Sequence, residues 1–202
     1  MIKYGLISET DGKTIEATLD LLTDKIPPNQ TINTCCIGIY NGDTDRGIVQ
    51  YLNQKGYTVC HTAIDNEKDK PVQKPVENCI LIIGDSTEVY HKLADESIDF
   101  LFVDGCHCMA HVVADFFCYS TKIKTNRYIL FHDTGEHISQ FKDFQHGDKE
   151  NPFAYISVRR ALERIGLLDD EIAGRCHGFE LIFDEADETD EAGGICVFKK
   201  LY

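Results

Sequence analysis

Five short apolar runs, separated by segments with helical periodicity, are the feature that most limits the folds open to this chain. The runs are continuously hydrophobic rather than alternating, which is typical of parallel strands buried on both faces of a sheet. Two more apolar runs near the C-terminus flank a short acidic connection, a pattern that predicts an antiparallel hairpin. The seven expected strands span about 34–39, 57–64, 79–83, 98–103, 128–131, 179–183 and 194–198.

Helices are expected between these runs. Apolar side chains recur at helical spacing over about 13–25, 48–52, 86–94, 111–119 and 157–165. Strands alternating with helices predict an α/β fold, with a doubly wound, mostly parallel sheet of seven strands, the last antiparallel, and helices on both faces. We expect a single domain over 1–202. Its parts are an N-terminal helix within 1–30, a core over 33–134, a loop or lid over 135–152, and a helix with the closing hairpin over 153–202.

The charge and apolar content of the chain limit the classes of partner that it is expected to bind. With 20 Lys and Arg against 34 Asp and Glu, the chain carries a formal charge of −14, so phosphate backbones and anionic membranes repel it. No segment approaches the roughly 18 apolar residues that a membrane-spanning helix needs, and the N-terminus lacks a signal-peptide pattern. Nine cysteines, mostly within apolar runs, indicate reduced thiols in a cytosol-like compartment. We therefore expect a cytoplasmic protein without nucleic-acid or membrane partners; a homo-oligomer is left open.

Acidic residues follow four of the first five strands. An open parallel sheet binds ligands beyond the carboxyl ends of its strands, so these positions should meet at one edge. A cluster of carboxylates and imidazoles there is a candidate active site. Its members would be Asp65, Asp85, Asp104, His107, His132 and Asp133.

The segment Gly38-Ile-Tyr-Asn-Gly42 follows the first strand. Two glycines allow the backbone to pass close to a ligand at a helix N-terminus. Asn41-Gly42 between apolar runs is also a common hairpin-turn signal. Asp65 follows Gly42 by 23 residues, close to the spacing at which dinucleotide-type folds place a carboxylate on a ribose. The two features together predict a ligand that contains adenosine.

The series of strand-end motifs resembles class I S-adenosylmethionine-dependent methyltransferases over about residues 33–134. The branch it resembles most is that of small O-methyltransferases, whose fourth strand ends in Asp-Gly-x-His and whose fifth ends in His-Asp. The resemblance implies a Rossmann-like fold and methyl transfer from S-adenosylmethionine to the hydroxyl of a small-molecule acceptor. The matching segments are Gly38 to Gly42, Asp65, Gly84-Asp85-Ser86, Ile98 to His107 and Ile129 to Asp133.

This resemblance also implies which residues bind the cofactor. The first loop would wrap the methionine part, the next acid would hold the ribose, and the third motif would lie by the adenine. In this sequence these residues are Gly38, Tyr40, Asn41 and Gly42 for methionine, Asp65 for ribose, and Asp85 and Ser86 for adenine.

By the same resemblance, Asp104 would face the methyl group and the acceptor, and His107 would be the general base. Asp104, His132 and Asp133 match positions at which related enzymes hold a divalent metal, usually Mg²⁺. One departure is Cys36, which stands where the family usually has the acid that helps to fix the cofactor's amino group.

The chemistry of methyl transfer explains these residue types. Displacement at a sulfonium methyl group needs an aligned acceptor and removal of its proton, for which an imidazole such as His107 is suited. A cation would activate a weakly acidic hydroxyl, and Asp104 and Asp133 are the hard ligands that Mg²⁺ prefers. His132 is softer and favours Zn²⁺, Mn²⁺ or Fe²⁺ if it coordinates.

Three other functions remain open from the residues. A nicotinamide-dependent oxidoreductase would share the glycine loop and Asp65, but the chain lacks the third glycine. A module that binds S-adenosylmethionine without turnover is suggested by Cys36, which stands where the family usually has an acid. A metal-dependent hydrolase would use the same aspartates and histidines, and would bind metal without responding to S-adenosylmethionine.

Several candidate residues have structural alternatives. Asp65 and Asp85 could be turn or N-cap residues, and His107 and His132 could satisfy loop backbone groups. Cys106-His107-Cys108 with His111 suggests zinc, yet a Cys-x-Cys pair without a second pair fits structural zinc spacing poorly. Five cysteines in or beside the strands are expected to pack in the core, namely Cys35, Cys36, Cys60, Cys79 and Cys196.

Overall fold

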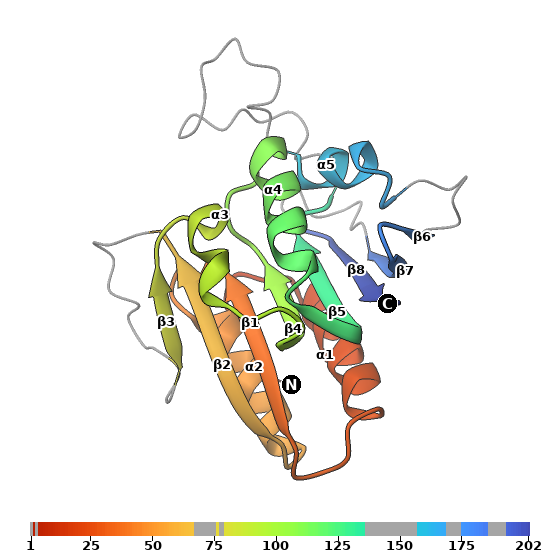
Figure 1. The fold of residues 1–202 in the computed structure, drawn as a ribbon. Helices are drawn as coiled ribbons and strands as arrows, with labels where there is room; N and C mark the ends of the chain where they lie inside the picture. Colours follow the sequence, from red (N-terminus) through yellow and green to blue (C-terminus); the bar gives the residue numbers. More distant parts are fainter. Residues whose placement is uncertain are drawn as a thin grey trace.

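A computed structural model describes residues 2, 4–66, 76, 79–135, 157–168, 175–185 and 193–202 (Figure 1). The helices are α1 (Glu9–Thr23), α2 (Asp43–Gln54), α3 (Ser86–Val89), the 3₁₀ turn η1 (Tyr90–Lys92), α4 (Met109–Ser120) and α5 (Val158–Arg164). The strands are β1 (Thr31–Ile37), β2 (Thr58–Asp65), β3 (Ile80–Ile83), β4 (Ile98–Val103), β5 (Ile123–His132), β6 (Arg175–Cys176), β7 (Phe179–Glu185) and β8 (Ile195–Lys200).

The strands form one sheet in the order β3-β2-β1-β4-β5-β8-β7-β6. The first five are mutually parallel, β8 runs antiparallel to β5, and β7 and β8 form the expected antiparallel hairpin. The predicted seven-stranded α/β sheet is therefore confirmed, and the two-residue strand β6 extends its edge. Strand order reverses between β1 and β4, and this switch point is where such a sheet binds ligands.

Helices cover both faces of the sheet, as Figure 1 shows, with α3, α4 and α5 on the near side and α1 and α2 on the far side. On the near side, Phe116 and Tyr119 of α4 and Leu162 of α5 are fully buried in one apolar cluster. On the far side, Leu19 of α1 and Ile48 of α2 belong to a second cluster. Within the described residues, no helix is both long enough and apolar enough to cross a membrane.

Strand β5 begins five residues before the predicted start. Its first half is polar and charged, so hydrophobic periodicity could not detect it. The charged side chains are paired instead: Lys124 Nζ lies 2.7 Å from Asp99 Oδ2 and Arg127 Nε lies 3.0 Å from Asp99 Oδ1. Asp99 is buried in β4 and also accepts a hydrogen bond from the backbone N–H of Asn33. Ion pairing to a buried acid therefore extends this strand.

Two alternatives from the sequence are wrong. Asn41-Gly42 does not form a hairpin, because Gly42, at φ +74°, caps α2, and β1 pairs with β2 in parallel. Cys60 is exposed and Cys79 is only half-buried, so neither packs in the core as expected. For Cys60 the reason is that β3 pairs only with the second half of β2, from Thr62 onward, which leaves the first half at an edge. Cys79 directly precedes β3, which is itself the edge strand of the sheet.

The remaining cysteine expectations hold. Cys35, Cys36 and Cys196 are buried, and none of the nine cysteines, all within the described residues, forms a disulfide. Apart from residue 135, the predicted loop or lid over 135–152 lies outside the described residues.

Candidate active site

A cavity of about 580 Å³ lies at the carboxyl ends of β1 and β4. It brings together nearly all the residues singled out from the sequence. Gly42 caps α2 beside it, and the predicted site residues among those that line it are Gly38, Tyr40, Asn41, Asp65, Asp85, Ser86, Asp104, His107, His132 and Asp133. The N-terminal segment adds Tyr4, Leu6 and Ile7. The strand-end rule thus predicted which residues line this cavity, although it does not fix the role of any of them.

The glycine loop is held tightly against the strand ends. Gly38 has φ +81°, and a Cβ there would lie 2.0 Å from the carbonyl oxygen of Asp104. The backbone N–H of Ile39 donates to Asp65 Oδ2 at 2.9 Å. Gly38 is therefore required by both its backbone conformation and its contact with the loop after β4. Asp65 also holds this loop, in addition to any contact with a ligand.

Asp85 and Ser86 have structural partners within the protein. Asp85 is the N-cap of α3, where Oδ1 accepts hydrogen bonds from the backbone N–H and the hydroxyl of Thr87. The hydroxyl of Ser86 donates to Asp115 Oδ1 at 2.6 Å. The N-cap alternative for Asp85 is therefore confirmed, and both residues still line the cavity.

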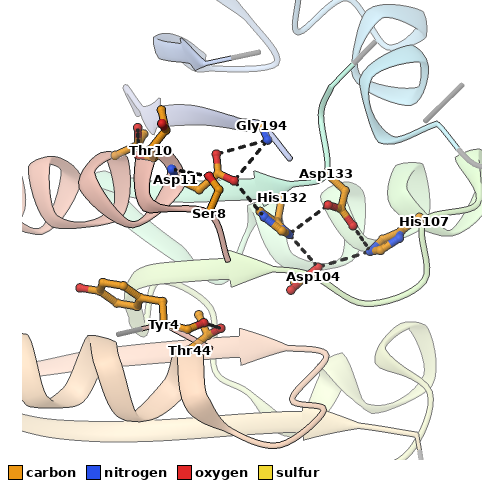
Figure 2. A network of polar contacts seen from close by, with 11 residues as sticks. Tyr4, Ser8, Thr10, Asp11, Thr44, Asp104, His107, His132, Asp133 and Gly194 are labelled. Carbon is orange, nitrogen blue, oxygen red and sulfur yellow. Dashed lines mark hydrogen bonds and ion pairs between the residues drawn. The ribbon is translucent and has the colours of Figure 1, made fainter. Parts of the chain in front are cut away.

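Two carboxylates and two imidazoles meet at the ends of β4 and β5 (Figure 2). Asp104 Oδ1 lies 3.2 Å from His132 Nδ1 and 3.3 Å from His107 Nε2. Asp133 contacts the same two nitrogens, at 3.3 Å each. His107 is 30% exposed at its side chain and His132 only 7%. His107 is thus the imidazole more accessible from the cavity.

Asp11, in the first turn of α1, extends this network and was not predicted. Its Oδ2 lies 3.4 Å from His132 Nε2, and its carboxylate accepts from the backbone N–H of Gly194 at 3.2 Å, as Figure 2 shows. Asp11 is fully buried. The only sequence signal was Ser8-x-x-Asp11, which indicates a helix start. Ser8 does accept a hydrogen bond from the backbone N–H of Asp11.

Burial and charge set the pKa values of this cluster in opposite directions. Burial lowers the pKa of His132, but its contacts with the carboxylates of Asp104 and Asp11 outweigh burial and raise the pKa to about 10. The pKa of His107 is also raised, because Asp104 and Asp133 outweigh burial. Burial raises the pKa of Asp104, yet the two histidines bring it below its usual value. Burial dominates at Asp133, whose pKa is raised.

The cluster fits a divalent cation. One ligand atom from each of Asp104, His107 and Asp133 lies within 4.8 Å of the others. His132 Nδ1 faces the same two carboxylates while its other nitrogen faces Asp11. A carboxylate behind the imidazole is the usual outer partner of a metal-binding histidine.

Residues 35–134 match a family model described as a methyltransferase domain. No match was found among curated proteins. Solved structures share the fold at low sequence identity. One is the O-methyltransferase TomG from Streptomyces achromogenes in complex with S-adenosylmethionine, at 12% identity and a TM-score of 0.65, covering 97% of this chain and 82% of that one.

Two further structures are informative. The O-methyltransferase from Bacillus cereus in complex with S-adenosylhomocysteine has 13% identity and a TM-score of 0.61, with 98% and 84% of the two chains covered. The mycinamycin-pathway methyltransferase MycE, in complex with Mg²⁺ and S-adenosylhomocysteine, has 14% identity and a TM-score of 0.54, with 85% and 45% covered. The family match agrees with the sheet order and with the cavity at the switch point of the sheet. This chain therefore carries a class I S-adenosylmethionine-dependent methyltransferase domain.

Proposed function

We propose that this protein transfers a methyl group from S-adenosylmethionine to a hydroxyl of a small molecule, with help from a divalent cation. The observation that carries the proposal is that a single cavity joins the glycine loop to the Asp104, His107 and Asp133 cluster. TomG and the Bacillus cereus enzyme are both O-methyltransferases, which supports the choice of oxygen as the acceptor atom.

The cofactor would lie along the glycine loop. Gly38 to Gly42 would contact its methionine part, Asp65 its ribose, and Asp85 and Ser86 the adenine end of the cavity. The hydrogen bond from Ile39 N–H to Asp65 fixes the loop before the ligand binds. Because Gly42 is the N-cap of α2, the dipole at the start of this helix favours the carboxylate of the methionine part.

The acceptor hydroxyl would lie beside His107. This imidazole is the more exposed of the two and is held by Asp104 and Asp133. In its neutral form it would take the hydroxyl proton as the oxygen attacks the methyl carbon. Asp104 and Asp133 orient the ring and stabilise the imidazolium that results.

Asp104 and Asp133 would hold the cation together with His132, the third ligand that the family resemblance implies. His107, whose nitrogen also lies within 4.8 Å of ligand atoms of the two carboxylates, would stay beside the cation as the base. A bound cation would lower the pKa of the acceptor hydroxyl and orient it. Asp11 would act behind His132, holding Nε2 so that Nδ1 points toward the carboxylates. The complex of MycE with Mg²⁺ is consistent with a cation in this fold.

Titration calorimetry with S-adenosylhomocysteine tests the cofactor end. We expect micromolar binding to the wild type and to Asp95→Ala, whose exposed acid pairs with Lys122 away from the cavity. Asp65→Ala should lose binding. Methyl transfer to a panel of phenol, sugar and polyketide hydroxyls then tests the acceptor. Absence of binding to the wild type would refute the proposal, whereas binding without transfer to any acceptor would favour a non-catalytic module.

Asp11→Asn is expected to weaken binding of Mg²⁺ or Mn²⁺ about 10- to 100-fold, because it removes the charge behind a ligand histidine. Asparagine retains an oxygen that can accept from the N–H of Gly194, so the fold should persist. Glu9→Gln is the matched control, since Glu9 lies in the same turn but faces solvent, where it pairs with Lys13. Calorimetry measures both affinities. Equal affinities for the two variants would contradict the role given to Asp11.

Cation binding is expected to release about one proton at pH 7. The pKa of His132 is about 10 in the cation-free cluster, so its Nδ1 must lose a proton before it can coordinate. Affinity should therefore rise with pH, by up to about tenfold per unit below that pKa. Calorimetry in buffers with different ionisation enthalpies measures the number of protons that are released when the cation binds. Binding without proton release would exclude His132 as a ligand.

A further inference from the structure

Two thiols and an imidazole lie together where β4 leads into α4. Cys106 Sγ is 3.2 Å from Cys108 Sγ, and a nitrogen of His111 lies within 4.8 Å of both sulfurs. Cys106 and His111 line the cavity, whereas Cys108 is only 5% exposed. An ion could therefore reach the cluster from the cavity without unfolding the protein.

The start of α4 creates this arrangement. Cys108 is the N-cap of α4, and His111 comes three residues later. Residues three apart lie on the same side of a helix, so the turn brings the imidazole beside the thiol. The spacing resembles no two-pair structural zinc motif, but a site with three protein ligands and one exchangeable position needs no second cysteine pair.

The surroundings favour a cation. His111 Nε2 lies 3.4 Å from Asp85 Oδ1 and 3.2 Å from Ser86 Oγ. One turn further along α4, Asp115 is fully buried, and its Oδ2 has no hydrogen-bond partner among the described residues. Its other oxygen accepts from the same Ser86 hydroxyl. Burial raises the pKa of Asp115 to about 6, and a cation nearby would stabilise its charged form.

We propose that Cys106, Cys108 and His111 bind Zn²⁺ or a similarly soft divalent cation, at a site separate from the Asp104 and Asp133 cluster. Binding breaks two S–H bonds, releases both protons to solvent and forms two metal–sulfur bonds, with no electron transfer. Two thiolates neutralise the dication. Thiolate and imidazole ligands favour Zn²⁺ over Mg²⁺, whereas the carboxylates of the other cluster favour Mg²⁺.

The proposed site would hold the loop that carries the proposed base. His107 stands between the two thiol ligands in the sequence, and His111 ties α4 to the loop after β3 through Asp85 and Ser86. A bound cation would therefore restrain the loop from Asp104 to Cys108. This role adds to the proposed methyl transfer, but the existence of the site does not depend on it.

A second mixed cluster, Cys36, Asp45 and His61, is a weaker candidate. All three residues are fully buried, and none lines the cavity. Both nitrogens of His61 already have close partners, Thr34 Oγ1 and Asp45 Oδ1, each at 2.8 Å. This cluster is better described as a hydrogen-bonded link between β1, β2 and α2.

Optical titration of the reduced, metal-free protein with Co²⁺ tests the proposal. We expect about one equivalent to produce thiolate-to-cobalt charge-transfer absorption, which Zn²⁺ abolishes and excess Mg²⁺ leaves intact. The Cys106→Ser/Cys108→Ser double variant should lose this absorption, and Cys60→Ser, at an exposed position, should retain it. Absence of the band in the wild type would overturn the proposal. Loss in Cys36→Ser but not in the double variant would assign the metal to the other cluster.

A second measurement on the wild type avoids any dependence on folding of the variants. Iodoacetamide labelling followed by peptide mass spectrometry gives the alkylation rate of each thiol. Zn²⁺ should slow alkylation of Cys106 at least tenfold while Cys60 reacts at an unchanged rate. Equal rates at Cys106 with and without Zn²⁺ would overturn the proposal, whether or not S-adenosylhomocysteine binds.

Discussion

Gly38→Ala is expected to destabilise the protein by about 2–5 kcal/mol and to abolish measurable binding of S-adenosylhomocysteine. A left-handed backbone costs a residue with a Cβ roughly 1–2 kcal/mol, and forcing an atom into a filled space typically costs about 1–3 kcal/mol more. Here φ is +81°, and the added Cβ would lie 2.0 Å from the backbone oxygen of Asp104. Backbone cannot move aside as a flexible side chain can. Both the glycine loop and the loop after β4 must therefore shift.

Gly56→Ala separates the cost of the left-handed backbone conformation from the cost of the steric clash. Gly56 has φ +85°, nearly the same conformation, but a Cβ there meets nothing within 4 Å. This variant should lose only about 1–2 kcal/mol and should bind S-adenosylhomocysteine as the wild type does. Thermal unfolding would show a decrease of roughly 5–15 °C for Gly38→Ala and less for Gly56→Ala. Equal decreases, or unchanged binding by Gly38→Ala, would show that the contact with Asp104 does not shape the cofactor loop.

The sequence predicted the elements whose signal is local. Buried parallel strands are continuous apolar runs, and their carboxyl ends meet at one edge, so both the sheet and the residues that line the cavity followed from the pattern. Asp104 directly follows β4 and His132 is the last residue of β5, and the two side chains are in contact. The polar start of β5 was missed because Lys124 and Arg127 are stabilised there by Asp99, a partner that periodicity does not reveal.

Interactions set by packing were not predictable in this way. Asp11 precedes His132 by 121 residues in the chain, and it reaches His132 only because α1 packs against the end of the sheet. Its local pattern indicates no more than a helix start. The sequence did single out Cys106, Cys108 and His111 as a possible zinc group. Comparison with two-pair zinc spacings then argued against it, because that comparison ignored the helical turn that brings His111 beside Cys108. The groups at the strand ends were therefore predictable, whereas Asp11, which a helix positions, was missed and the thiol group at the start of α4 was given too little weight.

His107→Gln is expected to lower the rate of methyl transfer about 10²- to 10⁴-fold, the range for loss of a general base. Affinity for S-adenosylhomocysteine should stay within about twofold, because the glycine loop and Asp65 are untouched. His91→Gln, at an exposed position on η1, is the matched control and should keep full activity. A rate loss with a parallel loss of S-adenosylhomocysteine binding would indicate a structural role for His107 instead.

The pH profile distinguishes a base from a residue that merely positions others. A base must be neutral, and the carboxylates of Asp104 and Asp133 raise the pKa of His107 above its usual 6.5. The wild-type rate at low cation concentration should therefore rise with pH to a midpoint above 6.5 and then level off. Added cation places positive charge beside the ring and should move that midpoint down. His107→Gln should lose this rise, so a variant that kept the same midpoint would assign proton removal to another group.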